Sequence, residues 1–239
     1  MPAFSTVELD YRVDSGDFFA RIKDLPDAIW LDSGQPLAVQ GRYDILSASP
    51  DCIIETYGEL STITDADGAR RSTEDPFTLI SELLAPLSTA GLEAHIEPFV
   101  GGVIGYFGYD LGRRYHRVER PQQMLTSLPD MRVGRYLWAL LIDHQERSAT
   151  LCFHPLCPVT LRRTVTEALR ANHTTAGSVE STRFFCQPFA PQISKREYLC
   201  QLEKVQQYIG AGDCYQVNFA HNFNASYSGD TFSAYRALR

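Results

Sequence analysis

The stretch from Gly101 to His116, GGVIGYFGYDLGRRYH, restricts the fold more than any other part of the sequence. Its glycines lie three apart at Gly102, Gly105 and Gly108, but the Lys-Ser or Lys-Thr pair of a phosphate-binding loop does not follow them. Alternation places apolar side chains on both faces of an extended segment, which predicts a central strand buried on both sides. Glycine within a strand indicates the close approach of another backbone or of a ligand, and we favour a crowded core strand without a ligand.

Other segments have the periodicity of strands or of amphipathic helices. We expect strands within residues 4–13, 28–34, 42–50, 52–64 (two strands), 133–143, 149–154 and 215–223. We expect helices within residues 15–25, 75–87, 158–172, 194–209 and 231–239. Asp75 before Pro76 and the pair Ser194 and Glu197 are typical helix starts.

Composition excludes several classes of protein. The chain has 239 residues, a net charge of −7 and a pI near 5.4, which argues against nucleic acid or an anionic membrane as the main partner. No apolar run is long enough to span a bilayer, and the N-terminus lacks the pattern of a signal peptide. The six cysteines form no C-x-x-C motif. We therefore expect a cytoplasmic protein with reduced thiols, mostly buried as small apolar side chains.

Four segments together resemble a known family, the chorismate-utilising enzymes. They are FGYDLGRR (107–114), YIGAGDCYQVNFAHNF (208–223), LPDMRVGRYLWALLIDH (128–144) and SGQPLAVQGRYDILSASP (33–50). In order and spacing they resemble component I of aminodeoxychorismate synthase, which is related to anthranilate synthase component I. The form FGYDLGRR favours the aminodeoxychorismate branch, and anthranilate synthase component I stays open as the alternative.

The resemblance implies a fold and a domain plan. It implies an α+β protein with large antiparallel sheets in a sandwich flanked by helices, of which this chain holds the N-terminal half. We expect the N-terminal lobe over residues 1–185, a linker over 186–193 and the incomplete start of the chorismate-binding domain over 194–239. The stretch 173–192, rich in Gly, Ser, Thr and Pro, is the best candidate for a linker.

The resemblance also implies a reaction. Such an enzyme uses magnesium and takes ammonia from a glutamine amidotransferase subunit to aminate chorismate to 4-amino-4-deoxychorismate, a step toward 4-aminobenzoate and folate. Its nucleophilic lysine lies in a Pro-Ile-Lys-Gly segment, which does not occur here, and its magnesium ligands lie outside this chain. The only lysines, Lys23, Lys195 and Lys204, have the positions of surface side chains. We therefore assign no catalytic and no metal-binding residue, and we expect the chain alone to be inactive.

One binding site follows from the resemblance, a tryptophan effector pocket in the N-terminal lobe. Matched residue by residue, it consists of Ser33, Gln40, Gly41, Arg42 and Tyr43. The family pattern has an aromatic residue in place of Gln40 and a serine in place of Gly41, which weakens the expected packing of an indole. The Arg42 side chain could pair with a ligand carboxylate or with an acidic residue of its own strand, and the sequence leaves both open. A catalytically inert amino-acid-binding fragment remains an alternative function.

Overall fold

The computed structural model describes residues 4–35, 41–88, 97–116, 128–171 and 184–239. The chain divides into two compact units, residues 1–172 and 173–239. The sequence-based linker over 186–193 lies inside the second unit, where it contributes to two short strands. The boundaries proposed for the family domains stay a prediction.

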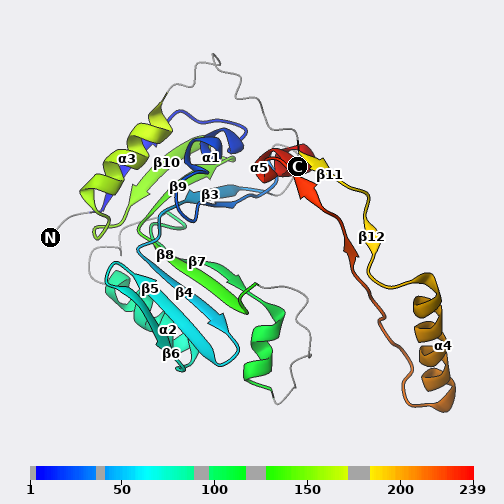
Figure 1. Cartoon of the computed structure of the whole chain (residues 1–239). Helices are drawn as coiled ribbons and strands as arrows, with labels where there is room; N and C mark the ends of the chain where they lie inside the picture. The colour runs from blue at the N-terminus through cyan, green and yellow to red at the C-terminus, as the bar shows by residue number, and fades with distance from the viewer. Residues whose placement is uncertain (1–3, 36–40, 89–96, 117–127, 172–183) are drawn as a thin grey trace. The chain divides into compact units, whose positions relative to one another are not determined.

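The first sheet of the first unit carries the largest apolar core. Its strand order is β1-β10-β9-β3-β2, with every neighbouring pair antiparallel (Figure 1). The strands are β1 (Ser5–Leu9), β2 (Ile29–Leu31), β3 (Tyr43–Ser47), β9 (Trp138–Asp143) and β10 (Ser148–Phe153). Helices α1 (Gly16–Ile22) and α3 (Val159–Arg170) pack on one face of this sheet through Phe18, Ile22, Val165 and Leu169. Every residue of β9 is buried, which makes β9 the centre of the unit.

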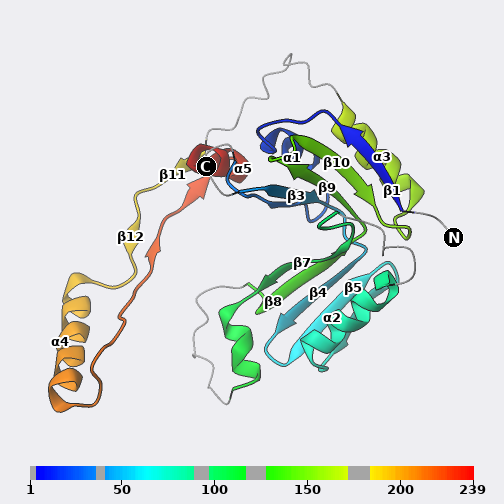
Figure 2. The ribbon, with the colours of Figure 1, turned by 180° about the vertical axis from the view of Figure 1, so that it is seen from behind.

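The second sheet has the order β6-β5-β4-β8-β7 and is also antiparallel (Figure 2). Its strands are β4 (Cys52–Tyr57), β5 (Leu60–Asp65), β6 (Gly68–Ser72), β7 (Gly102–Phe107) and β8 (Met131–Tyr136). Helix α2 (Pro76–Leu84), followed by the 3-10 turn η1 (Ala85–Ser88), covers this sheet with Leu79 and Leu83. The predicted α+β class, with antiparallel sheets and flanking helices, is confirmed.

The two sheets are linked by a bend that the sequence did not reveal. We expected one strand over residues 133–143, but the chain forms β8 in the second sheet and β9 in the first, with Leu137 between them. Apolar residues run through the bend without a turn signal, because Tyr136, Leu137 and Trp138 are all buried. The Trp138 indole N–H donates to the Ala48 carbonyl, 2.8 Å away, and fixes the start of β9.

The glycine-rich strand is an edge strand, so its predicted central position is wrong. Among the described residues, strand β7 pairs with β8 alone, and the side chains of Tyr106 and Phe107 are 39% and 53% exposed. The predicted close approach is confirmed at Gly105. A Cβ atom there would lie 2.1 Å from the Arg132 carbonyl oxygen and 2.6 Å from the Val133 Cα. The glycine therefore allows the backbones of β7 and β8 to come together.

In its described part, the second unit consists of one long helix, a shorter helix and two pairs of short strands. Helix α4 (Lys195–Ala211) begins at Ser194, whose hydroxyl accepts from the Glu197 N–H, and ends at Gly212 with φ 83°. The remaining elements are the strand pairs β11 (Phe185–Cys186) with β14 (Tyr227–Ser228) and β12 (Ala190–Pro191) with β13 (Phe223–Asn224), and helix α5 (Thr231–Leu238).

The strand predicted over 215–223 is wrong, apart from its last residue. Residues 213–222 are irregular, and Tyr215 is 92% exposed. An alternating pattern forms a strand only where a neighbouring strand pairs with its backbone groups. In the described part of the second unit, the strand pairs are only two residues long.

All six cysteines are free thiols, as predicted. The prediction that they are mostly buried holds for Cys52, Cys152 and Cys157, whereas Cys200 is exposed. Burial raises the pKa of Cys152 to about 12 and that of Cys157 to about 11, so both stay protonated near neutral pH. Among the helices of the described residues, none has the length and apolarity to cross a bilayer.

Candidate functional site

The described residues of the predicted effector site lie at the start of β3 and in the segment that directly follows β2. Ser33 and Gly41 lie against each other, because a Cβ atom at position 41 would be 2.4 Å from the Ser33 carbonyl oxygen. The side-chain amide of Gln35 donates to the Gly41 carbonyl at 2.9 Å and holds this contact. The departure from the family pattern at Gly41 thus has a steric reason in this chain. Gln40, the remaining departure, lies outside the described residues.

Arg42 is paired within the protein. Its Nε and Nη2 atoms donate to the same carboxylate oxygen of Asp143, at 3.0 and 2.8 Å, and its guanidinium lies 4.6 Å from the centre of the Tyr43 ring. The hydrogen bonds that Arg42 donates to Asp143 raise the pKa of Arg42. Arg42 therefore forms an ion pair, but its partner belongs to the neighbouring strand β9 and not to its own strand. A ligand carboxylate would have to share the guanidinium with Asp143.

Asp44 is a buried carboxylate that binds several residues of the site through hydrogen bonds. Its Oδ1 atom accepts the Ser33 backbone N–H at 2.7 Å, and its Oδ2 atom accepts the Ser15 hydroxyl. The Nε2 atom of His144 lies 3.0 Å from the same Oδ2, and His144 Nδ1 lies 3.0 Å from the Tyr11 hydroxyl. All of these contacts are satisfied when Tyr11 donates to Nδ1 and Nε2–H donates to Asp44.

Asp44 is kept ionised despite its burial. Burial on its own would raise the pKa of Asp44, but hydrogen bonds from Ser15, Ser33 and His144 outweigh it, so the pKa lies below its ordinary value. The pKa of Asp143 is lowered in the same way, because hydrogen bonds from Arg42 and from two backbone N–H groups outweigh its desolvation. The site therefore holds two carboxylates that remain charged near neutral pH.

Ser33 offers the group best suited to a ligand. Its hydroxyl oxygen is buried, and the Ser33 side chain helps to lower the pKa of the neighbouring Asp44 carboxyl. Asp32, next to it, accepts the Gly34 N–H at 2.8 Å. A buried hydroxyl beside carboxylates suits an ammonium group, because a hydroxyl can accept and the carboxylates supply opposite charge.

Sequence reasoning missed Asp44, His144, Tyr11 and Ser15. One signal was present: Asp44 is a charged residue within an apolar strand, where a carboxylate needs partners. In the sequence, His144 directly follows a predicted strand and Ser15 begins a predicted helix. In the structure Ser15 does occupy the cap position of α1, but its side chain makes no capping bond there.

The signature FGYDLGRR has a structural role in this chain. Its residues 109–114 form the 3-10 helix η3 (Tyr109–Arg114). The Arg114 guanidinium donates to the backbone carbonyls of Gly58, Thr73 and Glu74 at 2.8–3.0 Å, and its side chain is only 9% exposed. The hydrogen bonds of Arg114 therefore connect η3 with the β4–β5 turn and with the segment before α2.

The described residues provide neither a buried lysine nucleophile nor a cluster of metal ligands. Lys23, Lys195 and Lys204 are exposed, as predicted, so none lies in a desolvated pocket. The described ranges also contain no group of three or more His, Cys, Asp or Glu side chains placed to hold a metal ion.

The fold and these motifs define the class of the protein. The sequence profile of the chorismate binding enzyme family matches residues 28–239, and the chain belongs to that family. The crystal structure of anthranilate synthase component I from Streptococcus pneumoniae TIGR4 has the same fold, with a TM-score of 0.67 over 87% of this chain and 48% of that chain, at 21% identity.

Several curated proteins are similar in sequence to this chain. Aminodeoxychorismate synthase component 1 of Klebsiella aerogenes is 34% identical over 97% of this chain, and that of Escherichia coli K12 is 33% identical over 98%. The alpha subunit 2 of chloroplastic anthranilate synthase from Arabidopsis thaliana is 26% identical over 91%. The chain spans about half the length of the curated relatives it matches, since it covers 50% of each of the first two and 39% of the third.

Proposed function

We propose that the chain is the N-terminal portion of an aminodeoxychorismate synthase component 1, which aminates chorismate to 4-amino-4-deoxychorismate for 4-aminobenzoate and folate synthesis. The supporting observation is the difference in identity between the branches. Three relatives named aminodeoxychorismate synthase component 1 are 32–34% identical and a fourth, from Lactococcus lactis, is 26% identical, whereas the anthranilate synthases match at 24–28%. Anthranilate synthase component I is the weaker alternative.

The chemistry of this proposal depends on residues outside the chain. The described residues do not fit a magnesium site, so no step through the metal is derived from them. We assign to this chain the sheet lobe and an effector pocket, and to the remainder of the protein the lysine, the magnesium and the chorismate site. A glutamine amidotransferase subunit as the source of ammonia and a cytoplasmic location belong to the same proposal.

The products of the reaction test the branch. The coding sequence is read beyond codon 239, and the longer product is supplied with chorismate, magnesium and ammonium. Mass spectrometry is then expected to identify 4-amino-4-deoxychorismate. Anthranilate as the main product would assign the protein to the alternative branch, and the absence of both products would contradict the proposal.

The effector pocket is the second part of the proposed function. The ammonium group of a bound tryptophan would lie at the Ser33 hydroxyl, and the carboxylates of Asp32 and Asp44 would supply the opposite charge. The carboxylate of the tryptophan would share the Arg42 guanidinium with Asp143. Because Arg42 already has a partner, we expect weak binding rather than a tight effector site.

Titration calorimetry with L-tryptophan tests this pocket. Ser33→Ala and Arg42→Ala are each expected to weaken binding. Arg163→Ala is the matched control, because Arg163 is an exposed arginine on α3 with one acidic neighbour, Glu167 at 3.9 Å. If the wild type gives no heat signal at millimolar tryptophan, or if the two variants bind as the wild type does, the effector assignment is wrong.

A further inference from the structure

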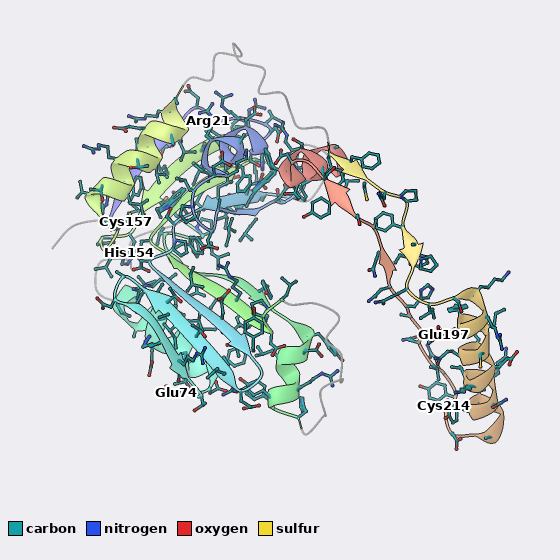
Figure 3. All side chains as sticks on the ribbon, in the orientation of Figure 1. Arg21, Glu74, His154, Cys157, Glu197 and Cys214 are labelled. Carbon is teal, nitrogen blue, oxygen red and sulfur yellow. The ribbon has the colours of Figure 1, made fainter. Side chains whose placement is uncertain are left out.

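A polar cavity lies in the first unit, and neither Ser33 nor Arg42 lines it. It has a volume of about 260 Å³ and lies between the end of β1, helix α1 and the end of α3. Its apolar lining includes Leu9, Phe18 and Leu169, and its cationic lining consists of Arg12, Arg21 and Arg170. Figure 3 labels Arg21 beside α1. The volume corresponds to about eight or nine water molecules, enough for a small organic molecule.

Arg21 is held in place with a free donor. One terminal nitrogen of its guanidinium donates to the Leu169 carbonyl, which fixes the side chain against the end of α3. Its Nε atom is buried and has no hydrogen-bond partner among the described residues. A buried N–H without a partner costs free energy unless a ligand or a water accepts from it.

The guanidinium groups of Arg12 and Arg21 lie near the same aromatic ring. Their central carbon atoms are 5.7 and 5.5 Å from the centre of the buried Phe18 ring. Burial and the neighbouring charge of Arg12 together lower the pKa of Arg21. Two like charges brought together in this way would be stabilised by an anion between them.

The acidic neighbours compensate these charges only in part. Asp17 lies 3.9 Å from Arg12 in a pair that is exposed on both sides. Glu8 accepts the Thr150 hydroxyl at 3.2 Å and is directed in part toward the sheet, whereas Asp10 lines the cavity. The side chain of Arg170, the last residue of α3, is exposed and lines the cavity.

We propose that this cavity binds a small organic anion, with a carboxylate or phosphate group on Arg12, Arg21 and Arg170 and the rest of the molecule beside Leu9, because the protein itself covers Phe18 and Leu169 almost completely. Guanidinium groups bind carboxylates and phosphates through paired N–H donors, which matches the three side chains and the free Nε of Arg21. The site is separate from the effector pocket and does not depend on the branch of the family.

The experiment uses two probes with the same ring and different head groups, phenylacetate and phenyl phosphate, together with inorganic phosphate. Each is titrated calorimetrically into the chain of 239 residues at low ionic strength. Saturable binding of one site per chain is expected for at least one organic probe, weakening as salt is added. Tighter binding of phenyl phosphate assigns the site to phosphate ligands, and tighter binding of phenylacetate assigns it to carboxylates.

The double variant Arg12→Gln/Arg170→Gln leaves the bond between Arg21 and Leu169 in place. It is expected to weaken binding about tenfold for each arginine lost, since each supplies a charge-assisted hydrogen bond. Arg163→Gln, the same change of charge at an α3 residue outside the cavity, should leave the affinity unchanged, and melting curves show that all variants fold. The proposal is overturned if neither organic probe saturates, or if the double variant binds like Arg163→Gln.

Discussion

Arg114 shows how a single side chain of the FGYDLGRR signature acts on the fold. It donates to three backbone carbonyls that belong to two different segments of the second sheet. Arg113, next to it, pairs instead with Asp110 within the same turn, at 2.6 Å. Adjacent arginines therefore have different tasks: one connects segments and the other forms a local ion pair.

Replacement of Arg114 tests this difference. Arg114→Ala is expected to lower the free energy of unfolding by about 2–3 kcal/mol, because charged hydrogen bonds to backbone carbonyls are lost. Arg113→Ala, the matched control, should cost below about 1 kcal/mol, as for other exposed ion pairs. Urea unfolding followed by circular dichroism measures both. Equal losses for the two variants would show that Arg114 is not a connection between segments.

Asp44 leads to a prediction about pH. Its pKa in the folded protein lies below its ordinary value of about 3.9, so the unfolded chain takes up the proton first as the pH falls. The contribution of Asp44 to stability is therefore complete above the unfolded pKa and is lost as the pH falls through the folded pKa. Urea unfolding between pH 6 and about pH 3 should show a smaller loss of stability in Asp44→Asn than in the wild type.

The same titration separates Asp44 from carboxylates that the solvent screens. Asp67→Asn changes an exposed aspartate in the β5–β6 turn and should leave the pH dependence as in the wild type. An Asp44→Asn profile parallel to that of the wild type would show that the hydrogen bonds of Ser15, Ser33 and His144 do not stabilise the ionised form.

At the scale of the element, strand β7 depends on one glycine. Gly105→Ala would place a methyl group 2.1 Å from the Arg132 carbonyl oxygen, so β7 and β8 would have to separate. We expect a loss of about 2–3 kcal/mol in the free energy of unfolding. Gly112→Ala is the control, because a Cβ there meets no atom within 4 Å and should be nearly neutral. If both changes are tolerated equally, the close approach of the two strands is not needed for stability.

An element can be predicted from the sequence when the residues that form its interactions lie close together in the chain. The caps at Asp75 and Ser194 depend on residues two or three positions away, and both were found: Asp75 accepts from Phe77 and Thr78, and Ser194 from Glu197. Strand β7 was placed at the centre because its apolar residues lie on both faces. Its actual edge position depends on partner strands, which a local pattern does not specify.

The candidate site was predictable in part for the same reason. Ser33, Gly41, Arg42 and Tyr43 follow one another closely in sequence and were found by resemblance. The bonds of Asp44 with His144, and of Arg42 with Asp143, connect residues about 100 positions apart, and only the pairing of β3 with β9 brings them together.

At the scale of the whole molecule, the two units differ in how much they bury. Helix α4 has no buried residue, whereas every residue of β9 in the first unit is buried. Hydrogen–deuterium exchange should therefore be complete in α4 well before it begins in β9, because local opening costs least where few apolar contacts hold an element. Protection of α4 equal to that of β9 would show that a surface not described by the structure covers this helix.

The most direct test of the account is an amination assay of the chain of 239 residues by itself. Chorismate, magnesium and ammonium are supplied, and Escherichia coli aminodeoxychorismate synthase component 1 serves as the positive control. We predict no 4-amino-4-deoxychorismate above the background without protein, because the described residues provide neither a buried lysine nor a metal site. Product that increases with the concentration of the chain would contradict the assignment of the chemistry to the remainder of the protein.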